Sequence, residues 1–432
     1  MFRFLRWALL VLLLTAAALA AGVLLLQRWL DSDDFRQRLA AQAQQALGLP
    51  VQLQRVEVAL WPAPALVLQG LMVQTRPALR AQRIEVRPRW ADLWHGQLAP
   101  ATLVLHQVHL SQAGVQALQA ALRVQASGEA TGVPWHWLPR RTVLDGLHWE
   151  DARGQVLTLQ AEVVLGSDAW PQQLTARIEQ GRLQGTRLQL EHLPLAAAEP
   201  LARRRWAVRL QVAGGTVQGR LALSPPAAPP AAWLLEGELR TQGVELSQLT
   251  AAHPTPQAQA RQPLSGRLQG TTRLSARLRG LQDWPQALHT RSDVSVQQAV
   301  LHGIDLARAV KTVGVSRGGS TPLDTLAGQV VTRGRALEVN PLVASSGVLS
   351  ASGQLAVSPQ QALSGRLVVA LGGAVGVPLA LGGTLAEPQV SLTRGAMIGA
   401  AIGTVLMPGV GTGAGASLGD RVSEGWKKLT GK

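Results

Sequence analysis

The stretch LSGRLQGTTRLSARLR (residues 264–279) decides the fold class of this chain. Leucine or alanine occupies positions 264, 268, 274, 276 and 278, whereas serine, glutamine and arginine fill most of the alternate positions. A period of two is typical of a β-strand with one buried face and one solvated face. The length of the stretch predicts one long strand, or two strands that bend at Gly270.

The same alternation recurs along the rest of the chain. It is clear over Val156–Leu165 and from Trp206 to Val212, and glycine, proline or polar clusters separate one run from the next. This spacing predicts a mainly β, antiparallel body. Few helical segments are available to cover the apolar side of such a sheet. That side is therefore buried on itself, as in a sandwich or barrel, or against a ligand in an open groove, and the pattern does not decide between them.

The N-terminus predicts a membrane anchor. The run Trp7–Leu26 carries no charge, Arg3 and Arg6 precede it, and acidic residues follow from Asp31. About 20 apolar residues suffice for a helix to span a bilayer. The positive-inside rule places the N-terminus in the cytoplasm and the body outside it. A cleaved signal peptide is the alternative, but the apolar run is longer than such a segment needs. The anchor positions are Trp7, Leu14, Leu26 and Trp29.

Three other segments predict helices. Asp33–Leu47 has the spacing of an amphipathic helix that ends at Gly48, and Ile304–Val313 has helical spacing too. Between Arg394 and Asp420 the chain is glycine-rich and uncharged. This C-terminal segment predicts either a helical hairpin that packs tightly or touches a membrane, or a cap over the end of the sheet.

Composition excludes several classes of function. The chain has 432 residues, no cysteine and a formal net charge of +15. The absence of cysteine excludes disulfides and thiolate metal sites. Positive charge suits nucleic acid or anionic lipid head groups. We expect no nucleic-acid partner, because the arginines are dispersed and the body is predicted to lie across a membrane from nucleic acid.

No motif predicts catalysis. Two Gly-x-Ser-x-Gly matches, at residues 314–318 and 415–419, lack the strand-then-helix context of a nucleophile elbow. The histidines show no metal-ligand spacing, and strand alternation predicts that His106 and His109 lie on opposite sides of a strand. We therefore expect no enzyme activity, no metal and no cofactor.

The order of motifs at the two ends resembles the AsmA family of bacterial envelope proteins. Toward the N-terminus the resemblance rests on the order of the following segments: the anchor, the short helix, Ala46–Val51, Leu60–Pro62, Ala65–Val73, Ile84–Pro88 and Leu93–Gly96. Toward the C-terminus it rests on the following segments: Val294–Ala309 with its Gly-Ile-Asp-Leu sequence, Thr321–Gly328, Gly347–Leu355 and Val377–Pro388. The resemblance covers roughly residues 1–110 and 290–392.

The resemblance implies a fold and an organisation. The fold is a long curved antiparallel sheet that forms a hydrophobic groove, as in TamB and the bridge-like lipid transfer proteins. The expected segments are the anchor at 1–30, a linker helix at 31–49, an N-terminal β-groove region at 50–290, a C-terminal β region at 291–392, and a Gly-rich helical segment at 393–432.

The resemblance also implies a function. It predicts a single-pass protein of the bacterial inner membrane whose periplasmic body conducts phospholipids toward the outer membrane and so supports outer-membrane biogenesis. Its expected partners are phospholipid acyl chains, the inner membrane, and the outer membrane or its proteins through the C-terminal segment. A periplasmic scaffold or chaperone for outer-membrane proteins, without lipid transport, is the alternative. The expected groove positions are Leu157, Leu159, Val163, Leu165, Trp206, Val208, Leu210, Val212, Leu264, Leu268, Leu274 and Leu278.

Overall fold

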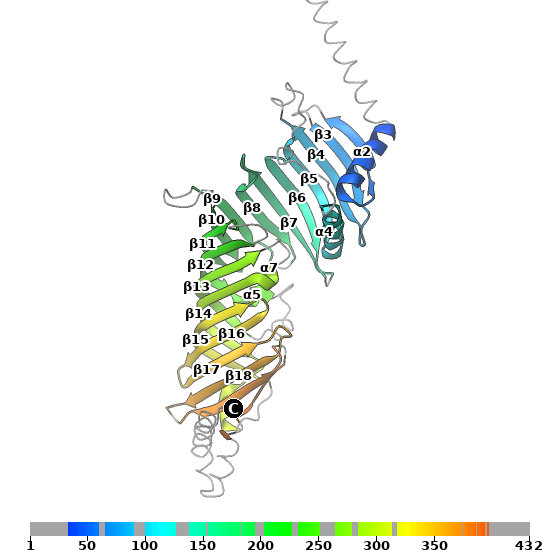
Figure 1. Ribbon diagram of the computed structural model, residues 1–432. Helices are drawn as coiled ribbons and strands as arrows, with labels where there is room; N and C mark the ends of the chain where they lie inside the picture. Colours follow the sequence, from blue (N-terminus) through cyan, green and yellow to red (C-terminus); the bar gives the residue numbers. More distant parts are fainter. Residues whose placement is uncertain are drawn as a thin grey trace, which may run out of the picture. The chain divides into compact units, whose positions relative to one another are not determined.

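The computed structural model is mainly β (Figure 1). It describes residues 33–396 apart from gaps at 60–64, 90–99, 127–137, 153, 182, 195–202, 227–231, 251–263, 279–283, 313–317, 374, 386 and 394. The described residues form twenty strands and few helices, which confirms the predicted class. The chain divides into two compact units, residues 1–184 and 185–432, and each is described by itself.

The described residues of the first unit form two helices and eight strands. The helices are α2 (Asp33–Leu47) and α4 (Gln112–Ala126). The strands are β1 (Val51–Gln52), β2 (Arg55–Ala59), β3 (Ala65–Val73), β4 (Leu79–Pro88), β5 (Pro100–Ser111), β6 (Arg141–Glu150), β7 (Val156–Leu165) and β8 (Pro171–Gln180). Both α2 and β7 have their predicted bounds. Gly48 follows α2 with a φ of 69°, a left-handed conformation that glycine adopts without strain, so the helix ends there.

One pair of strands departs from the predicted antiparallel pattern. Strands β5 and β6 run parallel, with Leu105 opposite Leu144, and α4 lies between them in the chain. Two parallel neighbours cannot be joined by a tight hairpin, so α4 belongs to the crossover. The Ser111 hydroxyl accepts a hydrogen bond of 3.1 Å from the Gly114 amide in the first turn of α4. The expectation of a wholly antiparallel sheet was therefore wrong at this point.

In the second unit, the part of the chain that the structure describes forms twelve strands and three short helices. The strands are β9 (Arg187–Leu193), β10 (Arg204–Val212), β11 (Gly215–Ser224), β12 (Trp233–Glu245), β13 (Leu264–Leu278), β14 (Leu288–His302), β15 (Ser320–Arg333), β16 (Ala336–Ser346), β17 (Leu349–Val357), β18 (Leu363–Leu371), β19 (Val377–Gly383) and β20 (Pro388–Leu392). The helices are α5 (Leu246–Thr250), α7 (Trp284–Ala287) and α8 (Leu306–Lys311). From β9 to β20 each strand pairs antiparallel with the next one in the chain. The boundary that we expected between the two β regions, after residue 290, lies within β14.

The deciding stretch of the sequence forms one strand, β13. It is continuous through Gly270, although its pairing with β12 shifts beside that residue: Thr241 lies opposite Gly270, and Val244 lies opposite Leu268. Its pairing with β14 shifts between Ser265 and Arg267. Gln298, the extra residue on β14, has a φ of 50°. β-Bulges of this kind bend a strand without ending it. The alternative of two strands was therefore wrong.

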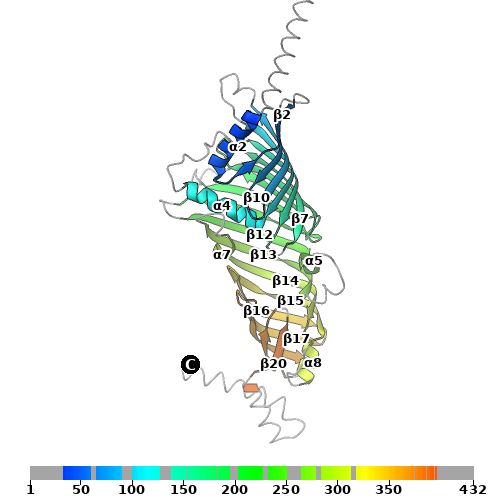
Figure 2. The same cartoon turned by 90° about the vertical axis from the view of Figure 1, so that its right-hand side faces the viewer.

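Each unit has a core where helices cover the sheet. In the first unit Leu47 of α2 and Leu118 of α4 pack against Val51, Val73 and Leu79. These two helices lie side by side over the blue and cyan strands in Figure 2.

In the second unit Leu306 and Ala309 of α8 are 1% and 0% exposed, within a cluster that reaches Val369 and Leu379. The Asp305 side chain caps α8 by accepting from the Arg308 amide at 2.8 Å. This cap starts the helix at Leu306, two residues later than predicted.

The predicted terminal segments lie outside the described residues. They are the anchor, with Trp7, Leu14, Leu26 and Trp29, and the chain from residue 397 onward. Among the residues that the structure describes, no helix is both long enough and apolar enough to span a membrane.

Candidate functional site: the apolar face of the sheet

Strand pairing places apolar residues from successive strands on one face of the second unit. Directly opposed residues share a face. Leu210 lies opposite Leu188 on one side and Val217 on the other, and Leu235 lies between Leu223 and Ala276. We call this surface the apolar face and the opposite surface, with Arg209 and Arg273, the polar face.

The structure brings the predicted groove positions of the second unit onto the apolar face. Leu274 lies opposite Gly237, and Gly237 lies opposite Leu221. Leu221 in turn lies opposite Trp206, so Leu274 and Trp206 share one face. The full set in this unit is Trp206, Val208, Leu210, Val212, Leu264, Leu268, Leu274 and Leu278. Leu264 and Leu268 differ from the others because they pack against the cluster that contains α8.

The first unit places the remaining four positions on one face of β7. Leu157 and Leu159 lie opposite Trp149 and Leu147 of β6, and Val163 lies opposite Leu174 of β8. Leu165 follows by alternation at the end of the strand. These residues form an apolar surface within their own unit.

Cover over the apolar face is uneven. The described helices α5 and α8 contribute Leu246, Leu306 and Ala309 to the cluster near β14–β18. On β9–β11 the described residues contain no helix and no member of a core cluster. Val208, Leu210 and Leu221 are each only partly buried there, whereas Trp206 and Val212 on the same face of β10 are 6% and 8% exposed. An apolar surface of this kind gains free energy when an apolar ligand covers it.

Four hydroxyl groups interrupt the apolar face, and the sequence pattern did not predict them as site residues. We call Thr272, Thr290, Ser292 and Thr332 the hydroxyl quartet. The Thr272 hydroxyl donates to Ser292 at 2.9 Å, and Thr290 and Thr332 share a hydrogen bond of 2.6 Å. Because the members satisfy each other across neighbouring strands, they can lie among apolar side chains at little cost. The sequence feature that could have revealed them is a serine or threonine at a position where alternation expects an apolar residue, repeated on three successive strands.

The polar face of the first unit carries a ladder of charged and amide side chains. Gln69 donates to Glu57 at 2.9 Å, and Arg141 donates to Glu162 at 2.7 Å. His106 Nδ1 lies 3.1 Å from Asp145 Oδ2. This ladder keeps the face hydrated and opposite in character to the apolar one.

The prediction that His106 and His109 lie on opposite sides of β5 was wrong. Gln107, between them, has a φ of 49°. Leu105 and Val108 on its two sides pack in the same core cluster, so both imidazoles lie on the opposite, polar face. His109 stacks on His148 with ring centroids 4.5 Å apart. Burial and then the charge of His109 lower the pKa of His148 from its ordinary value of 6.5. In the described part of the chain no three His, Cys, Asp or Glu residues are placed to hold a metal.

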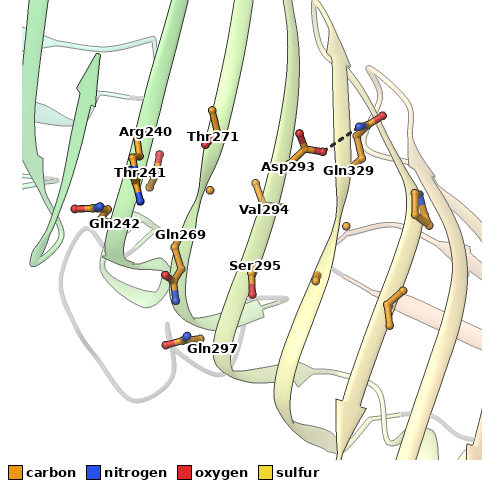
Figure 3. Close-up of a pocket in the computed structure, with 15 residues that line it drawn as sticks. Arg240, Thr241, Gln242, Gln269, Thr271, Asp293, Val294, Ser295, Gln297 and Gln329 are labelled. Atoms are coloured by element: carbon orange, nitrogen blue, oxygen red, sulfur yellow. Dashed lines mark hydrogen bonds between the residues drawn. The ribbon is translucent and has the colours of Figure 1, made fainter.

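A concavity of about 850 Å³ lies on the second unit, across β12–β16 (Figure 3). Its lining is rich in amides, and Gln329 donates to Asp293 at 2.9 Å. The labelled side chains are Arg240, Thr241, Gln242, Gln269, Thr271, Asp293, Val294, Ser295, Gln297 and Gln329. None of the predicted groove residues lines this concavity, so it is a separate feature of the sheet.

Comparisons of this chain with protein families, with curated proteins and with solved structures find no match. The resemblance to the AsmA family therefore rests on the sequence motifs alone.

Proposed function

We propose that the apolar face binds phospholipid acyl chains and conducts them along the sheet between the inner and outer membranes. The observation that supports this most directly is the partly buried apolar surface of β9–β11, which no described helix covers. The motif order shared with the AsmA family adds support for an anchored, periplasmic protein that contributes to outer-membrane biogenesis.

The mechanism follows from the contrast between the two faces. Acyl chains lie against residues such as Leu210, Leu221 and Leu274, while head groups stay at the hydrated edges of the strands. Each buried methylene contributes about 0.8 kcal/mol, so a lipid is held without a specific polar site. Because this attraction is non-directional, a lipid can move from one strand to the next with similar energy. We infer low selectivity among head groups.

Photo-crosslinking in the full chain tests this proposal. A benzoyl-phenylalanine introduced at Leu210 or Leu274 should form adducts with phospholipids in intact cells, detected by mass spectrometry of the purified protein. Arg209 and Arg273 provide matched controls, since each is the sequence neighbour of a test position and lies on the polar face. We expect lipid adducts at the first pair and none at the second.

Two outcomes would contradict the proposal. Equal lipid adducts at all four positions would mean adventitious contact with lipid. Protein adducts at Leu210 and Leu274, without lipid, would mean that the face holds a polypeptide, as the scaffold or chaperone alternative requires.

A further inference from the structure

A single cation lies on the apolar face of β9–β13. Arg204, the first residue of β10, lies opposite Leu223, and Leu223 lies opposite Leu235 of the apolar face. Among the described residues of these five strands, no other Arg, Lys, Asp or Glu lies on that face. A half-buried guanidinium at a position where alternation expects an apolar residue breaks the pattern of the sheet, and such departures are expected at functional sites.

A histidine lies beside this arginine on the same face. His192 is paired with Trp206 across β9 and β10, and the two rings meet edge to face with their centroids 6.2 Å apart. Arg204 is two residues from Trp206 on the same strand, so it is a diagonal neighbour of His192. His192 Nε2 is buried and has no hydrogen-bond partner among the described residues. A buried polar atom of this kind needs an explanation, and a bound ligand supplies one.

The two arginines that flank Arg204 are engaged on the polar face. Residues 203–205 are the only three consecutive charged residues in the chain. Arg203 Nη2 lies 3.3 Å from Glu236 Oε2, and Arg205 Nη2 donates to the Pro194 carbonyl at 3.2 Å. Alternation therefore places Arg204 alone, of the three, on the face with the apolar side chains.

We propose that Arg204 and His192 bind the phosphate group of a phospholipid whose acyl chains lie along β10. The site rests on the proposed function, because the same apolar face holds the chains. A guanidinium forms charge-assisted hydrogen bonds with phosphate, and an imidazole N–H is a further donor. Every phospholipid carries a phosphate, so the site leaves selectivity among head groups low. Its effect is to fix the direction in which the lipid lies.

The length of β10 suits a lipid held in this way. A strand rises about 3.3 Å per residue, so Leu210 is about 20 Å from Arg204. One leaflet of a hydrocarbon core of about 30 Å is about 15 Å thick, which is the space that an acyl chain fills. A chain that starts from a phosphate at Arg204 therefore extends past Trp206 and Val208 toward Leu210. The head group stays at the end of the strand, where water hydrates it.

The described carboxylates nearest to this end of the sheet lie on the polar face. Glu191 is opposite Ala207, and Glu236 is opposite Ala222. The connection between β9 and β10 carries one further carboxylate, Glu199, which lies outside the described residues. Glu199 is the alternative partner for Arg204, so a test of the site has to include it.

Photo-crosslinking of the full chain in vesicles tests the site. Benzoyl-phenylalanine at Leu210 captures lipid on the apolar face, and the vesicles contain phosphatidylcholine and a diacylglycerol with the same acyl chains. These lipids differ only in the phosphocholine group, and phosphatidylcholine has no net charge. Mass spectrometry gives the ratio of the two adducts. Because both adducts form on the same folded molecules, the ratio does not depend on how much of the protein is folded.

We expect the ratio, corrected for lipid content, to favour phosphatidylcholine by about tenfold in the unmodified site. Arg204→Gln should bring the ratio close to one, and Arg204→Lys should keep part of the preference, because an ammonium still attracts phosphate. His192→Phe should lower the ratio less, since it removes one donor and keeps a ring against Trp206. Arg209→Gln, on the polar face of the same strand, is the matched control and should leave the ratio unchanged. Glu199→Gln should not lower it.

Three results would overturn the site alone. A ratio that Arg204→Gln leaves unchanged would mean that Arg204 serves the fold, through Glu199 or another partner. A ratio that Arg209→Gln lowers equally would reflect the charge of the whole surface. A preference that disappears in excess inorganic phosphate, while both lipids still form adducts, would assign the site to free phosphate. Adducts with neither lipid would overturn the proposed function as well, so the two failures are distinguishable.

Discussion

The apolar face of the second unit has two regions that share one sequence pattern and differ in cover. On β10 and β11, Leu210 and Leu221 are only partly buried, although Trp206 and Val212 on the same face are 6% and 8% exposed. On β18, Leu367 and Val369 are 5% and 0% exposed. Both regions alternate apolar and polar residues with a period of two, so alternation alone does not predict whether a face is covered.

A short helix accounts for the difference. Asp305 begins α8, and the Thr321 hydroxyl accepts from the Leu306 amide at 2.9 Å while donating to the Ile304 carbonyl at 2.8 Å. These bonds hold Leu306 and Ala309 against the sheet. In the described residues of β9–β11 no equivalent insertion exists. A few residues between two strands therefore convert an open apolar face into a closed core.

The strongest test of this comparison is a charge placed in each region. Val369→Asp should cost several kcal/mol or prevent folding, because Val369 is 0% exposed and an unpaired carboxylate there loses its hydration. Leu210→Asp should cost about 1 kcal/mol or less, since its carboxylate can stay hydrated. Urea unfolding followed by circular dichroism measures both.

The Leu210→Asp variant also bears on lipid conduction. It should fold, keep its place in the membrane fraction and carry less crosslinked lipid at Leu274. If Leu210→Asp were as destabilising as Val369→Asp, the face at β10 would be covered and the contrast between the two regions would fail.

Two substitutions by alanine compare the loss of stability in the covered and open regions without adding a charge. Leu306→Ala should cost roughly 2–5 kcal/mol, because α8 fills a space that the core cannot close. Leu210→Ala should cost about 1 kcal/mol, since the leucine is already partly hydrated in the folded state. Hydrogen exchange should show faster opening of β14 and β15 in the first variant and unchanged rates there in the second. Equal effects would remove the distinction.

The sequence predicted the elements that depend on local pattern. Alternation placed β7, β10 and β13 correctly, and amphipathic spacing with Gly48 gave the bounds of α2. The predicted groove residues of the second unit share one face because alternation survives along each strand.

What the sequence did not predict depends on partners or on single backbone angles. The positive φ of Gln107 places His106 and His109 on one face, and no residue type in that stretch requires such an angle. Helix α4 was missed although its segment carried a helical signal: Val115, Leu118 and Leu122 recur at i, i+3 and i+7 among alanine and glutamine, which favour helices. The hydroxyl quartet was missed because its members pair only after three strands come together.

The smallest expected effect concerns this quartet, which lies on the apolar face of β13–β15. Ser292 is 8% exposed and pairs with Thr272. If the quartet belongs to the covered region, Ser292→Ala should cost about 1–2 kcal/mol, because the Thr272 hydroxyl loses its partner away from water.

Adding Thr272→Val to Ser292→Ala should then restore most of that stability, since no unpaired hydroxyl remains. Thermal unfolding of the two single variants and the double variant gives the coupling free energy between the residues. A single-variant cost near zero would show that water replaces the lost partner. The open region would then extend from β9 to β15, and α8 alone would mark where the covered core begins.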